Sequence, residues 1–503
     1  TNVPSGAVSG NISVANALVG GTLSVVGATH LKNTVSVGDA AKFASTVTIT
    51  GATGFLGSVR VSGATSVSNA NVGGTLTVAG AVSLASTLSV GGATNLLSTV
   101  TVAGATGFLG SVRVSGATSV SNANVGGTLT VAGAVSLAST LSVGGAANFA
   151  STVTVAGVGI FKDAVSVSGN LDVAGNVSVG GTIFATGGIT FDGDISVSGD
   201  VNIGGTLTVG GATSLASTLS VGGATNLLDT VTVAGATGFL STVRVSGAAT
   251  MASTLDVAGN TSVGGTLFVT GAGTFDNNVS VSGNLVVGGT ATVVGAMSVG
   301  GALSVGGATN LLSTVTVAGA TGFLSTVRVS GAATMASTLD IAGNTSVGGT
   351  LFVTGAGTFD NNVSVSGNLV VGGTATVVGA MSIGGAVSVG GATNLLSTVT
   401  VAGATGFLGT VRVSGAATMA STLDIAGNTS VGGTLFTTGA ATFDNNVSVS
   451  GNLVVGGTAT VVGAMSVGGA LSVGGATNLL STATVAGAVS LASTLSVGGA
   501  TNL

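Results

Sequence analysis

Apolar and polar residues alternate along this chain in blocks of six. The block Val243–Ala248 reads Val-Arg-Val-Ser-Gly-Ala, with apolar side chains at positions 1 and 3 and small or polar residues at positions 5 and 6. Such blocks continue from Leu129 to Leu503 without an insertion or a deletion. Alternation with a period of two is typical of a β-strand and places positions 1 and 3 on one face. The pattern therefore predicts a short strand and a corner every six residues.

The repeat predicts an all-β fold, a β-solenoid (β-helix) built from six-residue strand–corner repeats. Each strand is too short to be stable alone, but coiling stacks strand on strand, pairs the backbone groups between coils and encloses positions 1 and 3. A helix is disfavoured because each glycine in it would cost about 1 kcal/mol. Glycine is common at position 5, where its tolerance of positive φ suits a corner.

The pattern predicts an irregular N-terminal segment over 1–11 and a single continuous solenoid domain over 12–503. A 53-residue near-duplicate runs from Ala52 to Ala105, and an 84-residue period is marked by Gly-Gly-Ala-Thr-Asn-Leu segments around Ala224 and Ala308. Before Leu129 the register is interrupted three times by five-residue units of the form x-Val-Gly-Gly-Thr, each expected to form a tightened corner. These units are Leu18–Thr22, Asn71–Thr75 and Asn124–Thr128.

Two coil sizes fit the hexad: three hexads in a triangular coil of 18 residues, or two in a flattened coil of 12. The 84-residue period is seven pairs of hexads but not a whole number of triplets, which favours 12. An arginine also precedes an aspartate by twelve residues three times, at outward position 2. Stacking at twelve would pair these opposite charges on adjacent strands, worth about 0.2–1 kcal/mol, unless duplication merely copied one coincidence. This predicted structural ladder comprises Arg244, Asp256, Arg328, Asp340, Arg412 and Asp424.

Composition excludes several classes of protein. The 503 residues include 91 Gly but only 1 Pro, unlike collagen, and the chain is 45% hydrophobic and 4% charged, unlike a disordered one. No apolar run is long enough for a spanning helix, so the protein is not expected to span a membrane. Thirteen acids outnumber eight scattered cations, which argues against nucleic acid as a partner. Low surface charge favours association.

Two blocks, Thr261–Thr266 and Thr309–Thr314, resemble the hexapeptide repeat of left-handed β-helix proteins, in which a large aliphatic residue follows two residues after a small one. The best-known members of that family are acyltransferases that use a histidine at a subunit interface. His30 is the only histidine here and no other family feature surrounds it. The resemblance therefore implies the fold but not the activity.

The stretch Val165–Thr182 resembles the shafts of repetitive fibre proteins from phage tails and from large viruses of algae. This likeness covers nearly the whole chain. It implies a virion or surface fibre, often a trimer, in which a terminal domain does the binding. No such tip domain is visible in this sequence.

Residues suited to catalysis are scarce, since Glu, Cys, Tyr and Trp are absent and His30 is expected to be solvated. The densest acidic cluster is Asp192, Asp194 and Asp200, whose carboxylates on neighbouring corners are candidates for calcium, although a solvated polar patch is the favoured interpretation. No catalytic residue, cofactor or resident metal is predicted. Asparagine is a natural corner residue, and eight also lie in glycosylation sequons: Asn11, Asn176, Asn260, Asn278, Asn344, Asn362, Asn428 and Asn446.

These features predict a non-enzymatic structural fibre or filament subunit that forms a stiff shaft by self-assembly. The expected location is extracellular, at a cell surface or virion surface. Expected partners are copies of the chain itself, as a homo-oligomer or polymer with a trimer among the possibilities, and a host or cell surface. The alternatives are a surface adhesin that binds along its sides and an ice-binding solenoid, the latter suggested by Thr46-Val-Thr48 and Thr99-Val-Thr101.

Overall fold

The computed structural model describes residues 2–3 and 5–502, and every regular element in this part of the chain is a β-strand. From β19 (Leu129–Val131) to β80 (Leu495–Val497), each strand covers positions 1 to 3 of a six-residue block, and β81 (Thr501–Asn502) follows. The earlier strands are β1 (Asn2–Val3), β2 (Gly6–Val8), β3 (Ile12–Val14), β4 (Ala17–Val19), β5 (Leu23–Val25), β6 (Thr29–Leu31), β7 (Val35–Val37), β8 (Ala41–Phe43), β9 (Val47–Phe55), β10 (Val59–Val61), β11 (Thr65–Val72), β12 (Leu76–Val78), β13 (Val82–Leu84), β14 (Leu88–Val90), β15 (Thr94–Leu96), β16 (Val100–Phe108), β17 (Val112–Val114) and β18 (Thr118–Val125).

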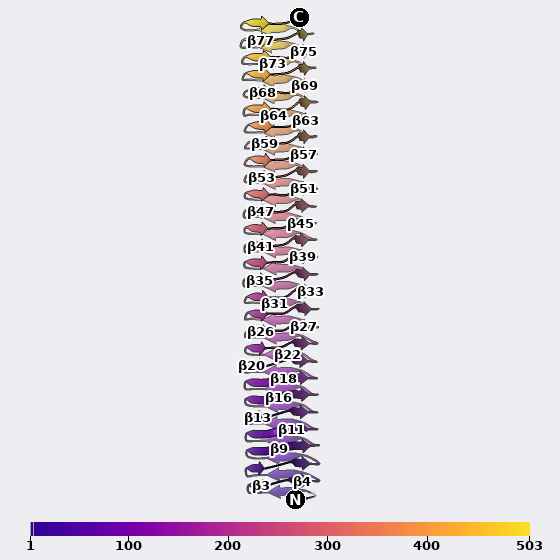
Figure 1. The fold of residues 1–503 in the computed structure, drawn as a ribbon, viewed down its shortest axis with the longest axis vertical. Coiled ribbons are helices and arrows are strands. Elements are labelled where there is room, and N and C mark those ends of the chain that lie inside the picture. The colour runs from indigo at the N-terminus through magenta and orange to yellow at the C-terminus, as the bar shows by residue number, and fades with distance from the viewer. Residues whose placement is uncertain (1, 4, 503) are drawn as a thin grey trace. The chain divides into compact units, whose positions relative to one another are not determined.

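The chain divides into two compact units, Thr1–Ala252 and Ser253–Leu503, where the sequence predicts one domain over 12–503. Both units consist of the same stacked strands, so no change in composition marks the division (Figure 1). The segment 1–11, predicted to be irregular, already contains β1 and β2, and β2 pairs in parallel with β5. Backbone pairing with the next coil imposes the strand there, although its side chains are small.

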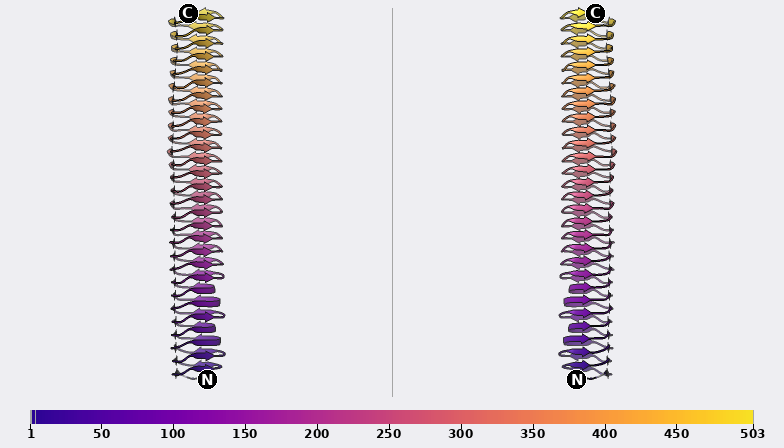
Figure 2. Two further views of the ribbon diagram at one scale, coloured as in Figure 1. Left: turned by 90° about the vertical axis from the view of Figure 1, so that its left-hand side faces the viewer. Right: turned by 90° about the vertical axis from the view of Figure 1, so that its right-hand side faces the viewer.

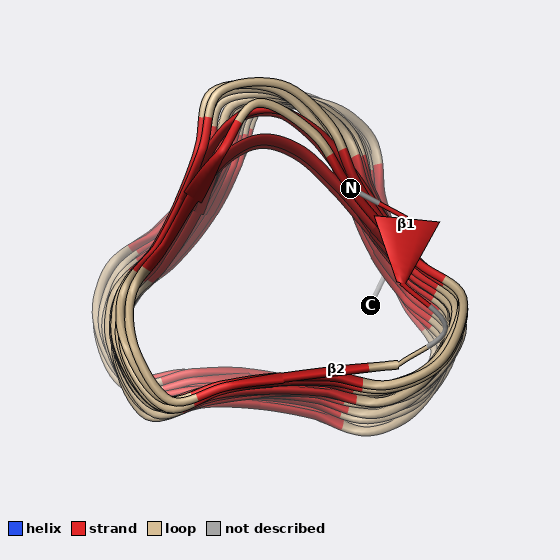
Figure 3. Cartoon of the chain, turned by 90° about the horizontal axis from the view of Figure 1, so that it is seen from below, coloured by secondary structure: helices blue, strands red, loops and turns tan. Residues whose placement is uncertain are grey.

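Three hexads make one coil, and the protein is a parallel β-solenoid of about 28 turns. From β19 onward and within each unit, a strand pairs with the strand three places further on, so β21 (Leu141–Val143) pairs with β24 (Gly159–Phe161) and Leu141 lies beside Gly159. Seen along the stack, each turn has three sides (Figure 3), and the strands of successive turns form parallel layers (Figure 2). The all-β solenoid prediction is confirmed, whereas the preference for a twelve-residue coil is wrong. Three strands enclose a wider core than two, with room for side chains as large as phenylalanine.

The three sides are named here after their strands. Face 1 contains β19 and every third strand after it, face 2 contains β20 (Val135–Leu137) and its successors, and face 3 contains β21 and its successors. In the earlier coils, face 1 is formed by β2, β5, β8, β10, β12, β15 and β17. A corner is named by the faces that it joins, so corner 2–3 leads from face 2 to face 3.

Positions 1 and 3 of the hexad face the core, as the alternation predicts. The strands show a buried–exposed–buried pattern, and the core side chains Val245, Met251 and Phe275 are each 2% exposed or less. Residues at position 2 point outward. Stiff β-branched valines suit the inward rows because they pack on a pleated surface with little loss of rotamer freedom.

Threonine also occupies position 1 in many coils and carries its hydroxyl into this core. Thr309 in β49 (Thr309–Leu311) and Thr345 in β55 (Thr345–Val347) are each 3% exposed, and neither Oγ1 has a hydrogen-bond partner. Leaving a buried polar group unpaired costs about 1–3 kcal/mol. Similar unpaired buried hydroxyls belong to Thr213, Thr225, Thr261, Thr393, Thr429 and Thr477.

The replacements Thr309→Val and Thr345→Val are expected to stabilise the second unit by about 1 kcal/mol each, because valine keeps the shape and removes the unpaired hydroxyl. Denaturant midpoints of the single and double variants measure this change. Thr316→Val is the matched control, since Thr316 is exposed at position 2 of β50 (Val315–Val317) and should change stability little. A loss of stability in the two core variants would show that these hydroxyls are paired.

Glycine is required at the corners because the coils approach closely, and not because of positive φ. No glycine of the described residues has a positive φ, so that part of the prediction is wrong. At Gly468, a Cβ would lie 2.6 Å from the carbonyl oxygen of Ser450 in the preceding coil. At Gly406, in an outward position of β65 (Thr405–Phe407), a Cβ would meet nothing within 4 Å.

Gly468→Ala is therefore expected to destabilise the second unit by about 1–3 kcal/mol, the usual cost of overpacking, because the clash is with backbone that cannot swing aside. Gly406→Ala provides the control and should be neutral or slightly stabilising, since alanine restricts the unfolded chain without a clash. Chemical denaturation measures the free energy of unfolding of both variants. Equal effects at the two sites would contradict close approach as the reason for glycine.

The three short units lie one strand earlier than the sequence predicts. In β11 the turn from face 2 to face 3 has two residues, Ser68 and Asn69, instead of three, and the strand continues through it with a register shift against β9. The same two-residue corner occurs at Ser121–Asn122 in β18 and at Ala15–Asn16 between β3 and β4. The Val-Gly-Gly-Thr segments that follow form corners of the usual length.

Candidate functional site

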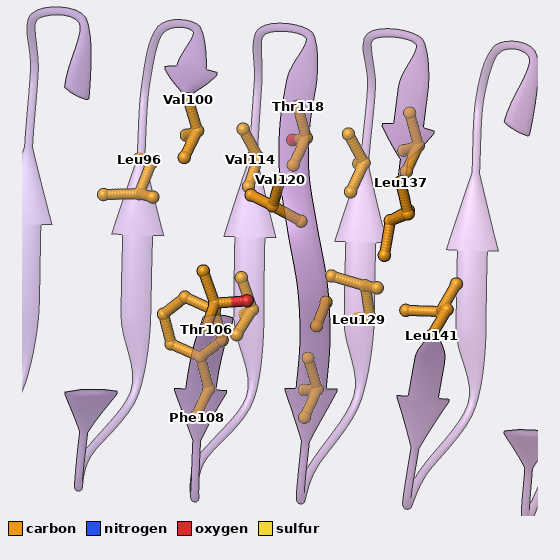
Figure 4. A pocket seen from close by; sticks show the side chains of 15 residues that line it. Leu96, Val100, Thr106, Phe108, Val114, Thr118, Val120, Leu129, Leu137 and Leu141 are labelled. Atoms are coloured by element: carbon orange, nitrogen blue, oxygen red, sulfur yellow. The ribbon is translucent and has the colours of Figure 1, made fainter. Parts of the chain in front are cut away.

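The core contains small cavities beside two of its short corners. An enclosed space of about 30 Å³ lies beside the two-residue corner of β18 and is lined by apolar side chains and threonines (Figure 4). The hydroxyl of Thr106 donates to the carbonyl of Asn122 at 2.9 Å, and Leu96, Val120 and Leu129 close the space. A similar space lies beside β11. These cavities have room for about one water and mark imperfect packing where a corner is one residue short.

The 84-residue duplication distributes the outward side chains of the repeat over all three faces. Eighty-four residues are four coils of 18 with twelve residues left over, so each copy of a residue moves to a different face. Phe268 lies on face 3, Phe352 on face 2 and Phe436 on face 1, and each is about 40% exposed. Each of these phenylalanines lies beside a valine of the next coil. No single face of the second unit collects them.

The predicted charge ladder does not form. Arg328 in β52 (Val327–Val329) lies between Asn310 and Ser346, whereas Asp340 in β54 (Leu339–Ile341) lies between Gly322 and Thr358 on another face. In the three-sided coil, strands pair at a spacing of 18 residues. Residues that are twelve apart in the sequence therefore lie two faces away from each other. The same holds elsewhere: Arg244 lies beside Asn226, Asp256 beside Thr274, Arg412 beside Asn394 and Ser430, and Asp424 beside Gly406 and Thr442.

The acidic candidates are spread over two corners. Asp192 and Asp194 lie in corner 2–3 before β30 (Ile195–Val197), and Asp200 lies in the next corner, after β30. No group of three His, Cys, Asp or Glu suited to a metal ion occurs within residues 2–3 and 5–502. The carboxylate of Asp194 accepts a hydrogen bond from the Ala212 amide at 2.9 Å. Asp194 is thus an exposed corner residue.

Asp200 accepts several hydrogen bonds from the next coil at one carboxylate oxygen. The Ser217 hydroxyl donates to its Oδ1 at 2.5 Å, and the hydroxyl and amide of Thr218 donate to the same oxygen at 2.7 and 3.2 Å. These bonds, the Ser217 bond foremost, lower the pKa of the Asp200 carboxyl from its ordinary value because they stabilise the charged form. Asp200 thus remains an anion that ties one coil to the next.

Corner asparagines form the most regular polar feature of the structure, and the sequence analysis assigned them no such role. The Oδ1 of Asn278 accepts the backbone N–H of Ala296, 18 residues on, at 2.8 Å, and the N–H of Asn278 itself donates to Asn260 at 3.2 Å. Asn69 performs the same function in its short corner, accepting from the amide of Thr87 at 3.1 Å. The signal in the sequence is an asparagine at position 6 of the hexad.

All eight sequon asparagines belong to these corner ladders. Each accepts, through Oδ1, a backbone N–H of the next coil. The following residue is an inward position 1 and the next an outward position 2, where serine is common. The hexad itself therefore generates the Asn-x-Ser motif, and its recurrence needs no glycosylation to explain it.

His30 lies beside one of the threonines considered for ice binding, but those threonines are separated from one another along the stack. His30 in β6 is exposed, as predicted, between Ser13 and Thr48. Thr48 in β9 and Thr101 in β16 both point outward from face 2, but Ser66 and Ser83 lie between them along the stack. Thr46 and Thr99 lie in the preceding corners. The threonines therefore do not form a continuous row.

Replacing a ladder asparagine is expected to loosen one contact between coils. Asn170 accepts the Gly188 amide at 2.9 Å, so Asn170→Ala should cost about 1 kcal/mol of stability, while Asn170→Asp should cost less because a carboxylate oxygen takes the same place in Asp194. Asn148→Ala is the control, because Asn148 points outward from β22 (Ala147–Phe149) and no hydrogen bond is assigned to it. Thermal unfolding followed by circular dichroism measures all three. A cost at Asn148 equal to that at Asn170 would speak against the ladder.

Comparisons with known proteins leave the structure as the main guide to function. No protein-family model matches the chain, and neither a curated protein nor a solved structure matches it. No helix in the described part of the chain has the length and the apolar character to cross a membrane.

Proposed function

We propose that this protein is the subunit of a structural fibre or filament, which forms a stiff shaft by self-assembly at a virion surface or cell surface outside the cell. The observation that supports this most strongly is the regularity of the coil. From β19 onward, strands follow one another at six-residue intervals with only a three-residue corner between them. Such a chain has no loop in which a lid or a substrate site could be built.

Stiffness follows from the backbone pairing within each unit. Each coil is joined to its neighbours on all three faces, as in the bond from the Gly180 amide to the Phe161 carbonyl at 2.8 Å. Each coil adds about 4.8 Å to the stack. In an array whose repeats contact only their neighbours, length increases with repeat number while the local energetics stay the same. Duplication of the 84-residue repeat is then a direct way to lengthen a shaft.

The surface composition supports a partner that is the chain itself. Charged residues make up only 4% of the chain, and outward apolar side chains such as Phe268, Phe352 and Phe436 are partly exposed. Low charge and exposed apolar area favour association over solubility. A homo-oligomer, a trimer included, or a polymer fits these properties, with a host or cell surface as a further partner. The resemblance to viral and phage fibre shafts agrees with this proposal.

The alternatives explain the surface less well. An adhesin would use side chains along the faces, and the exposed phenylalanines are its best support, but they are spread over three faces. Ice binding needs a regular flat row of threonines, and Ser66 and Ser83 interrupt the row on face 2.

Electron microscopy of the purified full chain tests the proposal. Extended rods or filaments are expected, and a variant lacking residues 255–338, one 84-residue repeat, should be shorter by about 22 Å per chain, since it loses nearly five coils. The deletion keeps the hexad register and serves as an internal ruler. Compact particles, or a length that the deletion leaves unchanged, would refute a shaft. Inhibition of ice growth by the same material would favour ice binding instead.

A further inference from the structure

Charge is distributed unevenly within the first unit. From the start of the chain to Lys162 there are five cations and one aspartate, a formal net charge of +4, whereas Asp163–Ala252 contains six aspartates and one arginine, a formal net charge of −5. Hydrogen bonds of the ladder do not require this separation, because Asn serves at corners as well as Asp. The corner hydrogen bonds therefore do not explain why cations and aspartates are separated along the first unit.

Three of the five cations lie on face 1, while Lys32 and Lys162 lie in corners. Lys42 in β8 and Arg60 in β10 are direct neighbours in the register, with Ser24 and Thr77 on either side of the pair, and both cations are exposed. The pair lines a shallow open groove on this face. Like charges directly opposite each other on adjacent strands are destabilising. Arg113 in β17 adds a third exposed cation to the same face.

The two Arg positions share a face because the 53-residue duplication spans three coils, one of them with a two-residue corner. Arg60 and Arg113 are equivalent residues of the two copies, 53 residues apart. Arg113 therefore lies on the same face as Arg60 and adds to the positive charge of face 1. The only aspartate before Lys162 is Asp39, which lies in the corner that precedes β8. Face 1 of these coils is therefore positively charged.

The negative charge gathers on the opposite side. Asp192, Asp194 and Asp229 all lie in corner 2–3 and are exposed, and Asp172 points outward from β26 (Leu171–Val173) on face 2. In a three-sided coil, corner 2–3 is the corner opposite face 1 (Figure 3). Asp192, Asp194 and Asp229 also lie roughly seven to ten coils further along the chain than Lys42 and Arg60, on the order of 40 Å away at the usual strand spacing, and roughly four to six coils beyond Arg113. One chain cannot pair its own basic face with its own acidic corner.

We propose that face 1 around Lys42, Arg60 and Arg113 docks the acidic corner formed by Asp192, Asp194 and Asp229 in a second copy of this chain. Copies would then lie side by side with an offset of roughly seven to ten coils. This inference rests on the proposed function and names its lateral contact. Each copy presents a basic face at one end of the first unit and an acidic corner at the other. Such a contact joins unlike surfaces, so it does not close after two copies and can continue into a polymer.

The energetics of this contact make it sensitive to salt. A single exposed ion pair contributes little to association, and a network of several pairs contributes more. Docking would also place carboxylates beside Lys42 and Arg60 and so reduce the repulsion between these two cations. The backbone bond that Asp194 accepts at one oxygen leaves its other oxygen for a partner. Because the groups are exposed, salt should screen the attraction strongly.

Charge reversal tests the contact in the full chain by sedimentation velocity at about 50 mM and 500 mM salt, concentrations that span the screening range. One variant carries Lys42→Glu and Arg60→Glu. The second carries Asp192→Lys, Asp194→Asn and Asp229→Lys, in which asparagine keeps the corner hydrogen bond. Each variant alone is expected to associate at least tenfold more weakly than the original chain at low salt. A mixture of the two should recover association, because each supplies the surface that the other lacks.

Arg328→Glu is the control, since Arg328 lies on face 1 of the second unit between Asn310 and Ser346 and outside the proposed contact; it should leave association unchanged. Circular dichroism checks that every variant is folded. Salt-independent association, or a mixture that fails to associate, overturns the docking proposal. The proposal is also overturned if the original chain does not self-associate but binds heparin, a polyanion probe, and the variant with Lys42→Glu and Arg60→Glu loses this binding. Filaments that survive both reversals contradict this contact alone, whereas the absence of any filament contradicts the proposed function.

Discussion

The parallel backbone ladder between residues 18 apart is the constraint on which the rest of this structure depends. It brings successive coils to the spacing of neighbouring strands on all three faces and at the corners as well. At corners this spacing leaves no room for a Cβ at Gly468 above Ser450. It also brings each corner amide within reach of an asparagine such as Asn278 in the coil before. Glycine content and asparagine placement are thus two results of one spacing.

The same ladder determines how duplication shapes the surface. A repeat of 84 residues is out of phase with the coil, so it scatters the equivalent residues Phe268, Phe352 and Phe436 over three different faces, and no face of the second unit collects them. The 53-residue repeat is in phase because a two-residue corner shortens one of its three coils. It therefore concentrates Arg60 and Arg113 on one face.

The core and the surface tolerate variation to different degrees. Inward positions accept Val, Leu, Ile, Met, Phe and even threonine with an unpaired hydroxyl, because each coil contributes only a few side chains and many coils share the cost. Corners hold mostly small and polar residues, among them Gly468, Ser450 and Asn278, because the backbones of adjacent coils lie close together there. A protein of this kind can change its length and its outward residues freely while the corner chemistry stays the same, which suits a shaft.

Local alternation was enough to predict the strands, the inward positions such as Val245 and Phe275, and the solenoid fold, because the period of two and the recurring corner are properties of neighbouring residues. The coil size was not predictable in this way, since two or three hexads produce the same inward and outward pattern. Only the tertiary structure decided that Arg328 lies beside Asn310 and Ser346 and not beside Asp340. It also decided that glycine avoids a clash between coils, and that the basic face and the acidic corner lie on opposite sides. These relations join residues that are 18 or more positions apart, and their distance in space depends on how many strands make one turn.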